Sequence, residues 1–492
     1  MLTVASQVDA LERRAIDVLQ EVISLRNSLR PVNRLPPEVL ASCATFVSDA
    51  DPRQIIPLTH VCRYWRRSIS SDPRCWASIS TGWRRLVPLC LERAGAVPLV
   101  VDITVSDIRS GEDFLEPLLP HALKIGSFRL AGYSSIEAVT NDLPGFFDSP
   151  MPNLTSLELR QNTEPTELFP PSEAPVPPVF QNVAKLESLC LTRTPLYPTI
   201  FSIASLVELK LLEYTVPFRF EAFIGFLGSN LDLERVILDV QFLIGSVQTV
   251  PARKVALVRL QHLSITCSKA IDSKGLLSCL SLPRGVHLEV VFSQPTQPPD
   301  LRSFLPSPPT PIQELLAPIT TIRSQHDPRE VHLSGNNSAF SFRCSKPHSG
   351  CYNELLCFPT SAVREFHTDI RPNTLFTSFL SWLLRKLPAL EVLAISGDPI
   401  HSGALSALAQ EPALCPALKT IAFFDCDMTR SQVDELETVV VKRKETTAAR
   451  LYTVVIVTKS TNASLDLELI HQLRRSIPHV EVRVDDKLPD LS

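Results

Sequence analysis

Glycine is scarce in this chain, with only 15 glycines among 492 residues. Three glycine motifs that position phosphates or nucleophiles, G-x-x-x-x-G-K-[ST], G-x-G-x-x-G and G-x-S-x-G, are all missing. A nucleotide-phosphate loop and the nucleophile elbow of a hydrolase are therefore excluded. Because no catalytic motif is recognised, we expect a protein that is not an enzyme and that uses no cofactor.

The chain also lacks an excess of basic charge and any long hydrophobic run. It has 48 Lys and Arg against 52 Asp and Glu, so few cations are left to neutralise the phosphates of a nucleic acid. No window reaches the roughly 18 apolar residues of a membrane span, and the first ten residues do not form a secretory signal. We expect no nucleic-acid or membrane partner, and a location in the cytoplasm, the nucleus or both.

The 12 cysteines are scattered at uneven intervals, unlike those of a disulfide-rich domain, and are predicted to be reduced and mostly buried. One cluster has the donor types that zinc prefers. It consists of Cys344, His348, Cys351 and Cys357, with His367 nearby. Its spacings match no paired C-x-x-C knuckle, so buried cysteines are the simpler interpretation. A zinc site, or an enzyme with an unrecognised cysteine or zinc site, is the alternative.

Apolar residues near the N-terminus alternate by four and three, which predicts a helix of roughly seven turns with one narrow apolar stripe. The stripe consists of Val4, Val8, Leu11, Ala15, Val18, Val22, Leu25 and Leu29. Pro31 should end this helix. The stripe is either the seam of a coiled-coil dimer or a face that folds back on the helices that follow.

Three short motifs follow this helix. They are Leu-Pro-Pro-Glu at 35–38, Val-Cys-x-x-Trp-Arg at 61–66 and Asp-Pro-x-x-Trp at 72–76. The two prolines and Glu38 suit the first turn of a helix, and a loop rich in Asp and Ser should follow at 48–51.

Pro57 is predicted to open a second, longer helix. Its apolar residues recur at helical spacing and should share one face. They are Leu58, Val61, Cys62, Trp65 and Ile69. A module this small cannot bury so much apolar surface by itself, so part of it should meet a partner or the next domain.

In this order the motifs resemble an F-box, the helical module that joins a recognition domain to a ubiquitin ligase of the SCF type. The layout of the whole chain is similar to the F-box proteins expanded in mushroom-forming fungi. The resemblance implies contact with the SCF adaptor subunit and, through it, a cullin. The residues that it implies for this contact are Leu35, Pro36, Val39, Leu58, Val61, Trp65 and Trp76. The two tryptophans have a second interpretation, in which they fill the core of the module.

Beyond residue 120 the chain repeats the spacing L-x-x-L-x-L at a period close to that of leucine-rich repeats. Nine copies begin at Ile125, Leu154, Leu186, Leu206, Leu233, Leu260, Val363, Leu390 and Leu418. The x-L-x-L part alternates like a strand with one buried face, so stacked copies predict a parallel sheet. Asn162 stands where regular leucine-rich repeats have a turn asparagine, and Thr194 and Cys426 are possible substitutes.

Parts of the array are less regular. Residues 270–360 have no readable register, although 286–292 and 341–344 have the pattern of strands. Proline-rich insertions at 164–178 and 295–318 are either solvated loops or docking segments for a proline-recognising domain.

The end of the chain shows a strand, a helix and a strand at 451–457, 465–477 and 480–484, a plausible cap for the sheet. The basic run Lys442–Lys444 is either a nuclear signal or a solvated helix end.

The predicted fold is α/β. It has an amphipathic helix at 1–31, a three-helix F-box-like domain at 32–82, and a degenerate leucine-rich-repeat-like solenoid at 83–492, a horseshoe with a parallel sheet. The predicted function is substrate recognition for an SCF-type ubiquitin ligase, with the repeats holding an unidentified target protein. The alternative is a non-catalytic interaction scaffold whose F-box-like fold no longer binds the adaptor.

Overall fold

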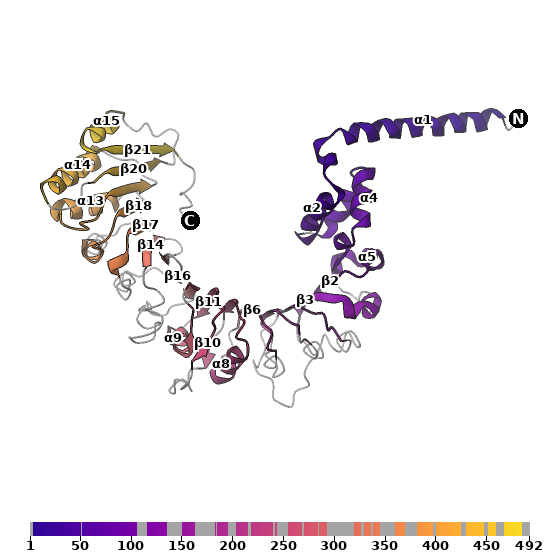
Figure 1. Ribbon diagram of the computed structural model, residues 1–492, viewed down its shortest axis with the longest axis horizontal. Coiled ribbons are helices and arrows are strands. Elements are labelled where there is room, and N and C mark those ends of the chain that lie inside the picture. The colour runs from indigo at the N-terminus through magenta and orange to yellow at the C-terminus, as the bar shows by residue number, and fades with distance from the viewer. Residues whose placement is uncertain are drawn as a thin grey trace. The chain divides into compact units, whose positions relative to one another are not determined.

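The chain divides into two compact units, Met1–Glu213 (unit 1) and Tyr214–Ser492 (unit 2), and each has its own buried apolar core. Figure 1 shows the helices and strands of both units. The computed structural model describes residues 3–50, 52–105, 116–134, 150–162, 183, 185–194, 203–214, 218–239, 242–243, 254–267, 270–283, 285–292, 319–325, 329–335, 338–344, 360–369, 381–396, 400–424, 430–446, 451–458 and 467–484. The proline-rich insertions 164–178 and 295–318 lie outside these residues.

Unit 1 begins with the predicted long helix, α1 (Thr3–Ser28), which ends before Pro31. Its large apolar side chains are exposed; for example, Val4 near its start is 69% exposed and Leu25 near its end is 63% exposed. The stripe therefore does not fold back on the helices that follow, and that interpretation is wrong. Among the described residues no helix is both long and apolar enough to cross a bilayer.

A set of short helices follows, which we call the helical module (residues 31–76). Its elements are η1 (Pro31–Arg34), α2 (Pro37–Ala50), η2 (Pro52–Gln54), α3 (Ile55–Thr59), α4 (Arg63–Ser71) and η3 (Pro73–Trp76). As predicted, the first α-helix of the module starts at Pro37 with Glu38 in its first turn. The expected loop at 48–51 is wrong, because α2 continues to Ala50.

The predicted helix from Pro57 through Ile69 is also wrong, because the chain forms two helices there. After α3, the amides of His60 and Val61 bond back to the carbonyls of Pro57 and Leu58, which tightens the last turn. Cys62 is then fully extended, with φ −161° and ψ 174°. Side chains before and after this break consequently do not share one helical face.

Among the described residues of unit 1, six strands form a sheet in chain order, and each pairs in parallel with the next. They are β1 (Ser78–Ser80), β2 (Leu99–Thr104), β3 (Ile125–Tyr133), β4 (Ser156–Gln161), β5 (Ser188–Thr192) and β6 (Glu208–Leu212). The helices between the early strands are η4 (Thr81–Leu86), α5 (Val87–Ala94) and η6 (Glu116–Lys124). The repeat spacing predicted β3 to β6 but not β1 and β2. The strand β1 follows the helical module directly, so the sheet begins inside the predicted F-box-like domain.

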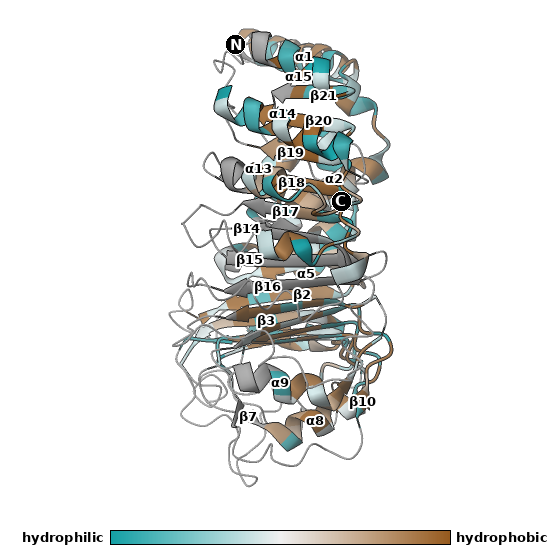
Figure 2. Cartoon of the chain, turned by 90° about the vertical axis from the view of Figure 1, so that its left-hand side faces the viewer, coloured by the Kyte–Doolittle hydropathy of each residue, from teal (hydrophilic) through white to brown (hydrophobic). Residues whose placement is uncertain are grey.

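The repeat spacing works because its leucines come into register across the sheet. Phe128, Leu157, Leu189 and Leu209 are paired neighbours on successive strands, and all four are fully buried. The leucines two positions later form a second buried row in the same way. Burial of these two rows removes a continuous apolar face from water, which is the main stabilising term of such a stack. The strands β2 and β3 are largely brown, hence hydrophobic, in Figure 2.

The turns after the strands partly follow the predicted pattern. Asn162 donates its side-chain amide to the carbonyl of Gly132 at 3.0 Å. The hydroxyl of Thr194 is fully buried and bonds to the carbonyls of Leu159 and Thr192, at 3.2 and 3.1 Å. Thr194 therefore does take the place of an asparagine, as predicted, while Cys426 lies outside the described residues.

The main sheet of unit 2 has the order β8-β11-β13-β16-β15-β14-β17-β18-β19-β20-β21. Its first strands are β8 (Arg235–Asp239), β11 (His262–Cys267), β13 (His287–Phe292), β14 (Ile319–Gln325), β15 (Arg329–Gly335) and β16 (Ser338–Cys344). Its remaining strands are β17 (Glu365–Asp369), β18 (Val392–Ser396), β19 (Thr420–Phe424), β20 (Thr453–Thr458) and β21 (His479–Val484). Short pairs form beside it between β7 (Phe218–Arg219) and β9 (Phe242–Leu243), and between β10 (Val255–Ala256) and β12 (Leu280–Ser281).

The prediction of a purely parallel sheet is wrong at one place. The strand β15 pairs antiparallel with both β14 and β16, so the three form a meander inside the parallel array. Such a meander needs only short connections, whereas parallel neighbours need a crossover. It falls in residues 270–360, where the sequence shows no repeat register.

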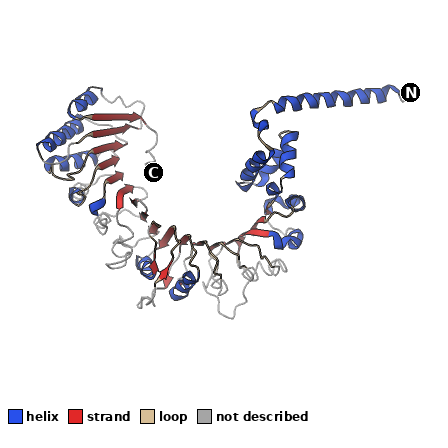
Figure 3. Cartoon of the chain, viewed as in Figure 1, coloured by secondary structure: helices blue, strands red, loops and turns tan. Residues whose placement is uncertain are grey.

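The helices of unit 2 are α8 (Phe220–Ser229), α9 (Ala270–Cys279), η11 (Thr360–Ala362), α13 (Ile400–Gln410), α14 (Arg430–Glu445) and α15 (Leu467–Ser476). The last three lie together on one side of the strands β18 to β21 (Figure 3). The predicted strand, helix and strand at the end of the chain are β20, α15 and β21, and they continue the parallel sheet. The observed fold is thus mixed α/β, built from stacked and mainly parallel strands.

Both interpretations of the basic run 442–444 are wrong for its central residue. Arg443 is 1% exposed, although it carries a full charge in the last turn of α14. Its guanidinium donates to the carbonyls of Pro412, Leu414 and Cys415 at 2.8 to 3.0 Å. It therefore ties α14 to the turn that precedes β19.

Candidate functional site

The helix α2 is apolar on two faces. Leu40, Ala41 and Ala44 are buried and make up the face that packs on the rest of the module. The opposite face carries Val39, Cys43, Phe46 and Val47, at i, i+4, i+7 and i+8, and all four side chains are exposed. A helix that is apolar on both sides normally has neighbours on both sides, so this second face is a candidate contact surface.

Phe46 is the centre of that surface. Its side chain is 79% exposed, which is unusual for a phenylalanine. Together with Glu38 and Ser42, the four apolar residues line a shallow groove of about 520 Å³. We call this groove and its residues the α2 surface. Sequence reasoning named Val39 but missed Phe46, although the spacing of Val39, Cys43 and Phe46 within the helix was available as a signal.

The predicted contact residues Leu35 and Pro36 lie immediately before α2. Leu35 is half-buried and Pro36 is exposed. The carbonyl of Leu35 accepts a hydrogen bond from the hydroxyl of Tyr64 at 2.5 Å, and Trp65 donates its indole N–H to Asn33 at 2.6 Å. Two aromatic side chains of α4 thus hold the segment that leads into α2.

Trp76 does not contribute to a contact surface, and its predicted role there is wrong. It is 1% exposed, its indole N–H donates to the carbonyl of Ile69 at 3.0 Å, and the Arg93 guanidinium lies 4.4 Å from the ring centroid. Burial satisfies both its apolar ring and its donor. Trp76 therefore fills the core, which was the second interpretation.

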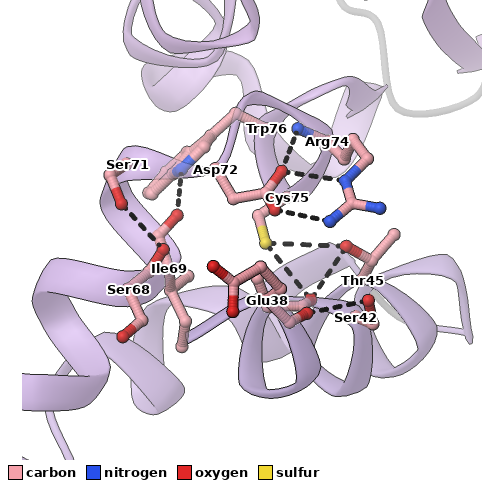
Figure 4. A network of polar contacts seen from close by, with 11 residues as sticks. Glu38, Ser42, Thr45, Ser68, Ile69, Ser71, Asp72, Arg74, Cys75 and Trp76 are labelled. Carbon is pink, nitrogen blue, oxygen red and sulfur yellow. Dashed lines mark hydrogen bonds and ion pairs between the residues drawn. The ribbon is translucent and has the colours of Figure 1, made fainter. Parts of the chain in front are cut away.

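The turn that carries Trp76 is fixed against α2 by polar contacts (Figure 4). Cys75 lies 3.5 Å from both the Thr45 hydroxyl and the Ala41 carbonyl of α2. Asp72 caps η3 by accepting from the amide and the side chain of Arg74, and these bonds hold the pKa of Asp72 below its ordinary value. The α2 surface therefore lies on a helix whose other side is firmly anchored.

The other predicted contact residues do not join the α2 surface. Leu58 and Trp65 are half-buried within the module. Val61 is 54% exposed, but it lines a different groove, of about 340 Å³, between the end of α1 and the start of α4. Of the seven predicted residues, only the segment at Leu35–Pro36 and Val39 lie on or beside the α2 surface.

The sheets offer a second candidate surface, formed by the side chains opposite the leucine rows. In unit 1 this outer face is charged: Asp102, Arg129 and Glu158 are paired neighbours on β2, β3 and β4. Arg129 forms ion pairs with both carboxylates, at 3.6 and 3.1 Å. Lys210 and Glu208 form a further pair at 2.8 Å on β6.

In unit 2 the outer face changes in character along the sheet. The rings of His262 and His287 stack with centroids 5.0 Å apart, and burial followed by the charge of His287 lowers the pKa of His262. Further along, the outer face of β18 to β20 is apolar and buried. It consists of Ala394, Ala422, Phe424 and Val457, with Val455 packed against them.

Cysteine chemistry finds little support in the described part of the chain. Burial raises the pKa of Cys190 to about 11 and that of Cys415 to about 12, so both thiols stay protonated at neutral pH. The described residues contain no group of three or more side chains that could hold a metal ion. The side chains of the proposed zinc cluster lie outside the described part, except that of His367.

Comparisons with known proteins add one finding. No protein-family model matches the chain, and no curated protein matches it. Among solved structures, the leucine-rich repeat-containing protein LegL7 from Legionella pneumophila is similar, at 12% identity over 73% of this chain and 82% of that chain, with a TM-score of 0.21. A likeness this weak carries no conclusion about function.

Proposed function

We propose that this chain is a substrate-recognition subunit of an SCF-type ubiquitin ligase. The helical module binds the adaptor subunit and, through it, the cullin, while the outer face of the repeat sheet holds a target protein. Ubiquitin transfer is then promoted by proximity, because the target is held near the ubiquitin-charged enzyme at a high effective concentration. No residue of this chain takes part in the bond chemistry.

The observation that carries this proposal is the exposed α2 surface. Val39, Cys43, Phe46 and Val47 face solvent on a helix whose opposite face is already packed. This surface directly follows the Leu-Pro-Pro-Glu motif through which the chain resembles an F-box. An anchored helix with an exposed aromatic residue has the features of an interface hot spot.

A binding assay with the purified adaptor subunit tests this proposal. We expect wild-type protein to bind, and Phe46→Asp to weaken binding by about tenfold or more, because the aromatic anchor is replaced by a charge. Replacing both Leu35 and Pro36 by Ala should also weaken it.

The matched control is Leu123→Asp, which places the same charge at another exposed apolar position of unit 1, 55% exposed on η6. It should bind like wild type. Failure of the wild-type protein to bind, or equal binding by the Phe46→Asp variant, would contradict the ligase function.

One observation favours the second candidate function, a scaffold that no longer binds the adaptor. The exposed apolar stripe of α1 is an assembly surface that adaptor binding does not require. Wild-type protein that forms a stable dimer through residues 1–30 and does not bind the adaptor would support the scaffold.

A further inference from the structure

The helix α1 presents an unpaired apolar seam to solvent. Its apolar stripe repeats with the 3.5-residue period of a coiled coil over about four heptads. The inner positions are Val4, Leu11, Val18 and Leu25 at d, and Val8, Ala15, Val22 and Leu29 at a. The large side chains among them are 55–69% exposed in the single chain. A seam of this length is about 39 Å long, at 1.5 Å per residue.

The seam faces away from the helical module. Among the described contacts, two α1 residues hydrogen-bond to the module: Gln20 contacts Arg63, and the carbonyl of Asn27 accepts from Asn33 at 2.7 Å. Both are at the f position of the heptad, on the side of the helix opposite to a and d. The contact with the module therefore orients α1 and leaves the seam free.

A helix in this situation gains stability from a partner. Helix formation in water is marginal for short isolated segments, and most helical stability in proteins comes from packing an apolar face. Here the whole of that face is exposed. Pairing would bury the seam along its full length.

The charges beside the seam fit a second copy of the same helix. Arg14 and Glu21 are at g positions, and Arg26 is at an e position. In a parallel pair Glu21 meets Arg26 of the other copy, and in an antiparallel pair Glu21 meets Arg14 of the other copy. The seam is thus electrostatically complementary to itself in either orientation.

The same charges disfavour a membrane as the occupant. A helix that lies on an anionic bilayer carries Lys and Arg on its polar face. Within α1 there are three arginines and no lysine against four acidic residues, which gives 3 − 4 = −1. A surface of this mixed character matches a protein helix.

From these observations we propose that the chain forms a homodimer in which the a and d residues of α1 pair with those of a second copy. Val8 and Val22 at a, combined with Leu11 and Leu25 at d, have the pattern that favours two strands over larger assemblies. The dimer carries two helical modules and two repeat sheets, and it does not depend on the proposed ligase function.

Sedimentation equilibrium of the full-length chain at micromolar concentration tests this proposal. We expect a mass twice the 54.6 kDa of the single chain. Leu11→Asp places a charge in the seam and should raise the dimer dissociation constant by at least tenfold. Ala10→Asp, one residue earlier on the polar face, is the matched control and should remain dimeric. Neither residue packs on the helical module or the sheets, so both variants should keep the wild-type unfolding transition of the sheets, while α1 of the Leu11→Asp variant loses the stability that pairing gives.

A charge exchange makes the test specific for self-pairing. Glu21→Arg should weaken the dimer, because arginine then faces arginine in either orientation. Adding Arg14→Glu and Arg26→Glu to that variant should restore it.

Several results would overturn the proposal. They are a wild-type monomer, an unchanged dimer with Leu11→Asp, an equal loss with Ala10→Asp, and no rescue by the charge exchange. A monomer that binds phosphatidylserine vesicles through α1 would assign the seam to a membrane instead. Adaptor binding is measured on the same variants, and Leu11→Asp should leave it unchanged, so the two proposals fail separately.

Discussion

Arg443 shows how one buried charge can organise a turn. Its guanidinium donates hydrogen bonds to three main-chain carbonyls, those of Pro412, Leu414 and Cys415. Burial lowers the pKa of Arg443, since the charged form is desolvated. The hydrogen bonds from the guanidinium to these carbonyls offset that cost. A run of three basic residues does not reveal this, because Lys442 and Lys444 on either side remain exposed.

We expect Arg443→Met to lower the free energy of unfolding of unit 2 by about 2–4 kcal/mol, because it removes three charge-assisted hydrogen bonds to main-chain carbonyls. The measurement is urea denaturation followed by circular dichroism. Lys442→Met is the control: its ammonium bonds to the Ala409 carbonyl at 2.9 Å from an exposed position, so its loss should cost under about 1 kcal/mol. Equal midpoints for the two variants would show that the carbonyls find other partners.

At the scale of elements, the turn after β5 depends on a hydrogen-bonded pair from two repeats. The hydroxyls of Tyr133, at the end of β3, and Thr194 lie 2.7 Å apart, and both residues are buried. Thr194 also bonds to the carbonyl of Leu159, at the end of β4. One short side chain thereby links three successive repeats, as the turn asparagine of a regular leucine-rich repeat would.

We expect Thr194→Val and Tyr133→Phe each to destabilise unit 1 by about 1–3 kcal/mol, and the double variant to lose less than the sum. A double-mutant cycle in urea denaturation measures this coupling. Thr155→Val is the control, since its hydroxyl bonds to the Gly126 carbonyl, which also accepts from the Thr155 amide. Strict additivity would mean that the two hydroxyls act independently.

The elements also show what the sequence could and could not predict. All nine L-x-x-L-x-L spacings fall on strands, because a buried row of leucines is a property of spacing alone. The break at Cys62 was not predictable, because it depends on a local 3₁₀ ending that leaves the apolar pattern intact. The α2 surface was only partly found, since periodicity shows that two faces are apolar but not which one the fold covers. The antiparallel β15 was missed, because its pairing depends on neighbours and not on a repeat.

At the scale of the whole molecule, the exposed apolar residues and the repeat cores are under different constraints. Phe46 and the seam of α1 are exposed and contribute little to folding, so they are free to be specified by partners. The leucine rows, in contrast, are fully buried and are specified by packing. Substitutions at the two kinds of position should therefore separate binding from stability.

The two compact units should unfold in two separate transitions on heating. Leu189 in unit 1 and Leu393 in unit 2 are both fully buried on their strands. Leu→Ala at such positions costs about 2–5 kcal/mol, which for units of this size lowers a transition temperature by about 4–20 °C. Differential scanning calorimetry should resolve two transitions, with Leu189→Ala lowering one and Leu393→Ala the other. Cys190→Ala, on the outer face beside Leu189, should lower neither transition temperature by more than about 3 °C.

A single transition that both leucine substitutions lower alike would contradict this prediction. It would mean that the repeats unfold as one cooperative stack, because coupling between neighbouring repeats then exceeds the difference in stability between the units.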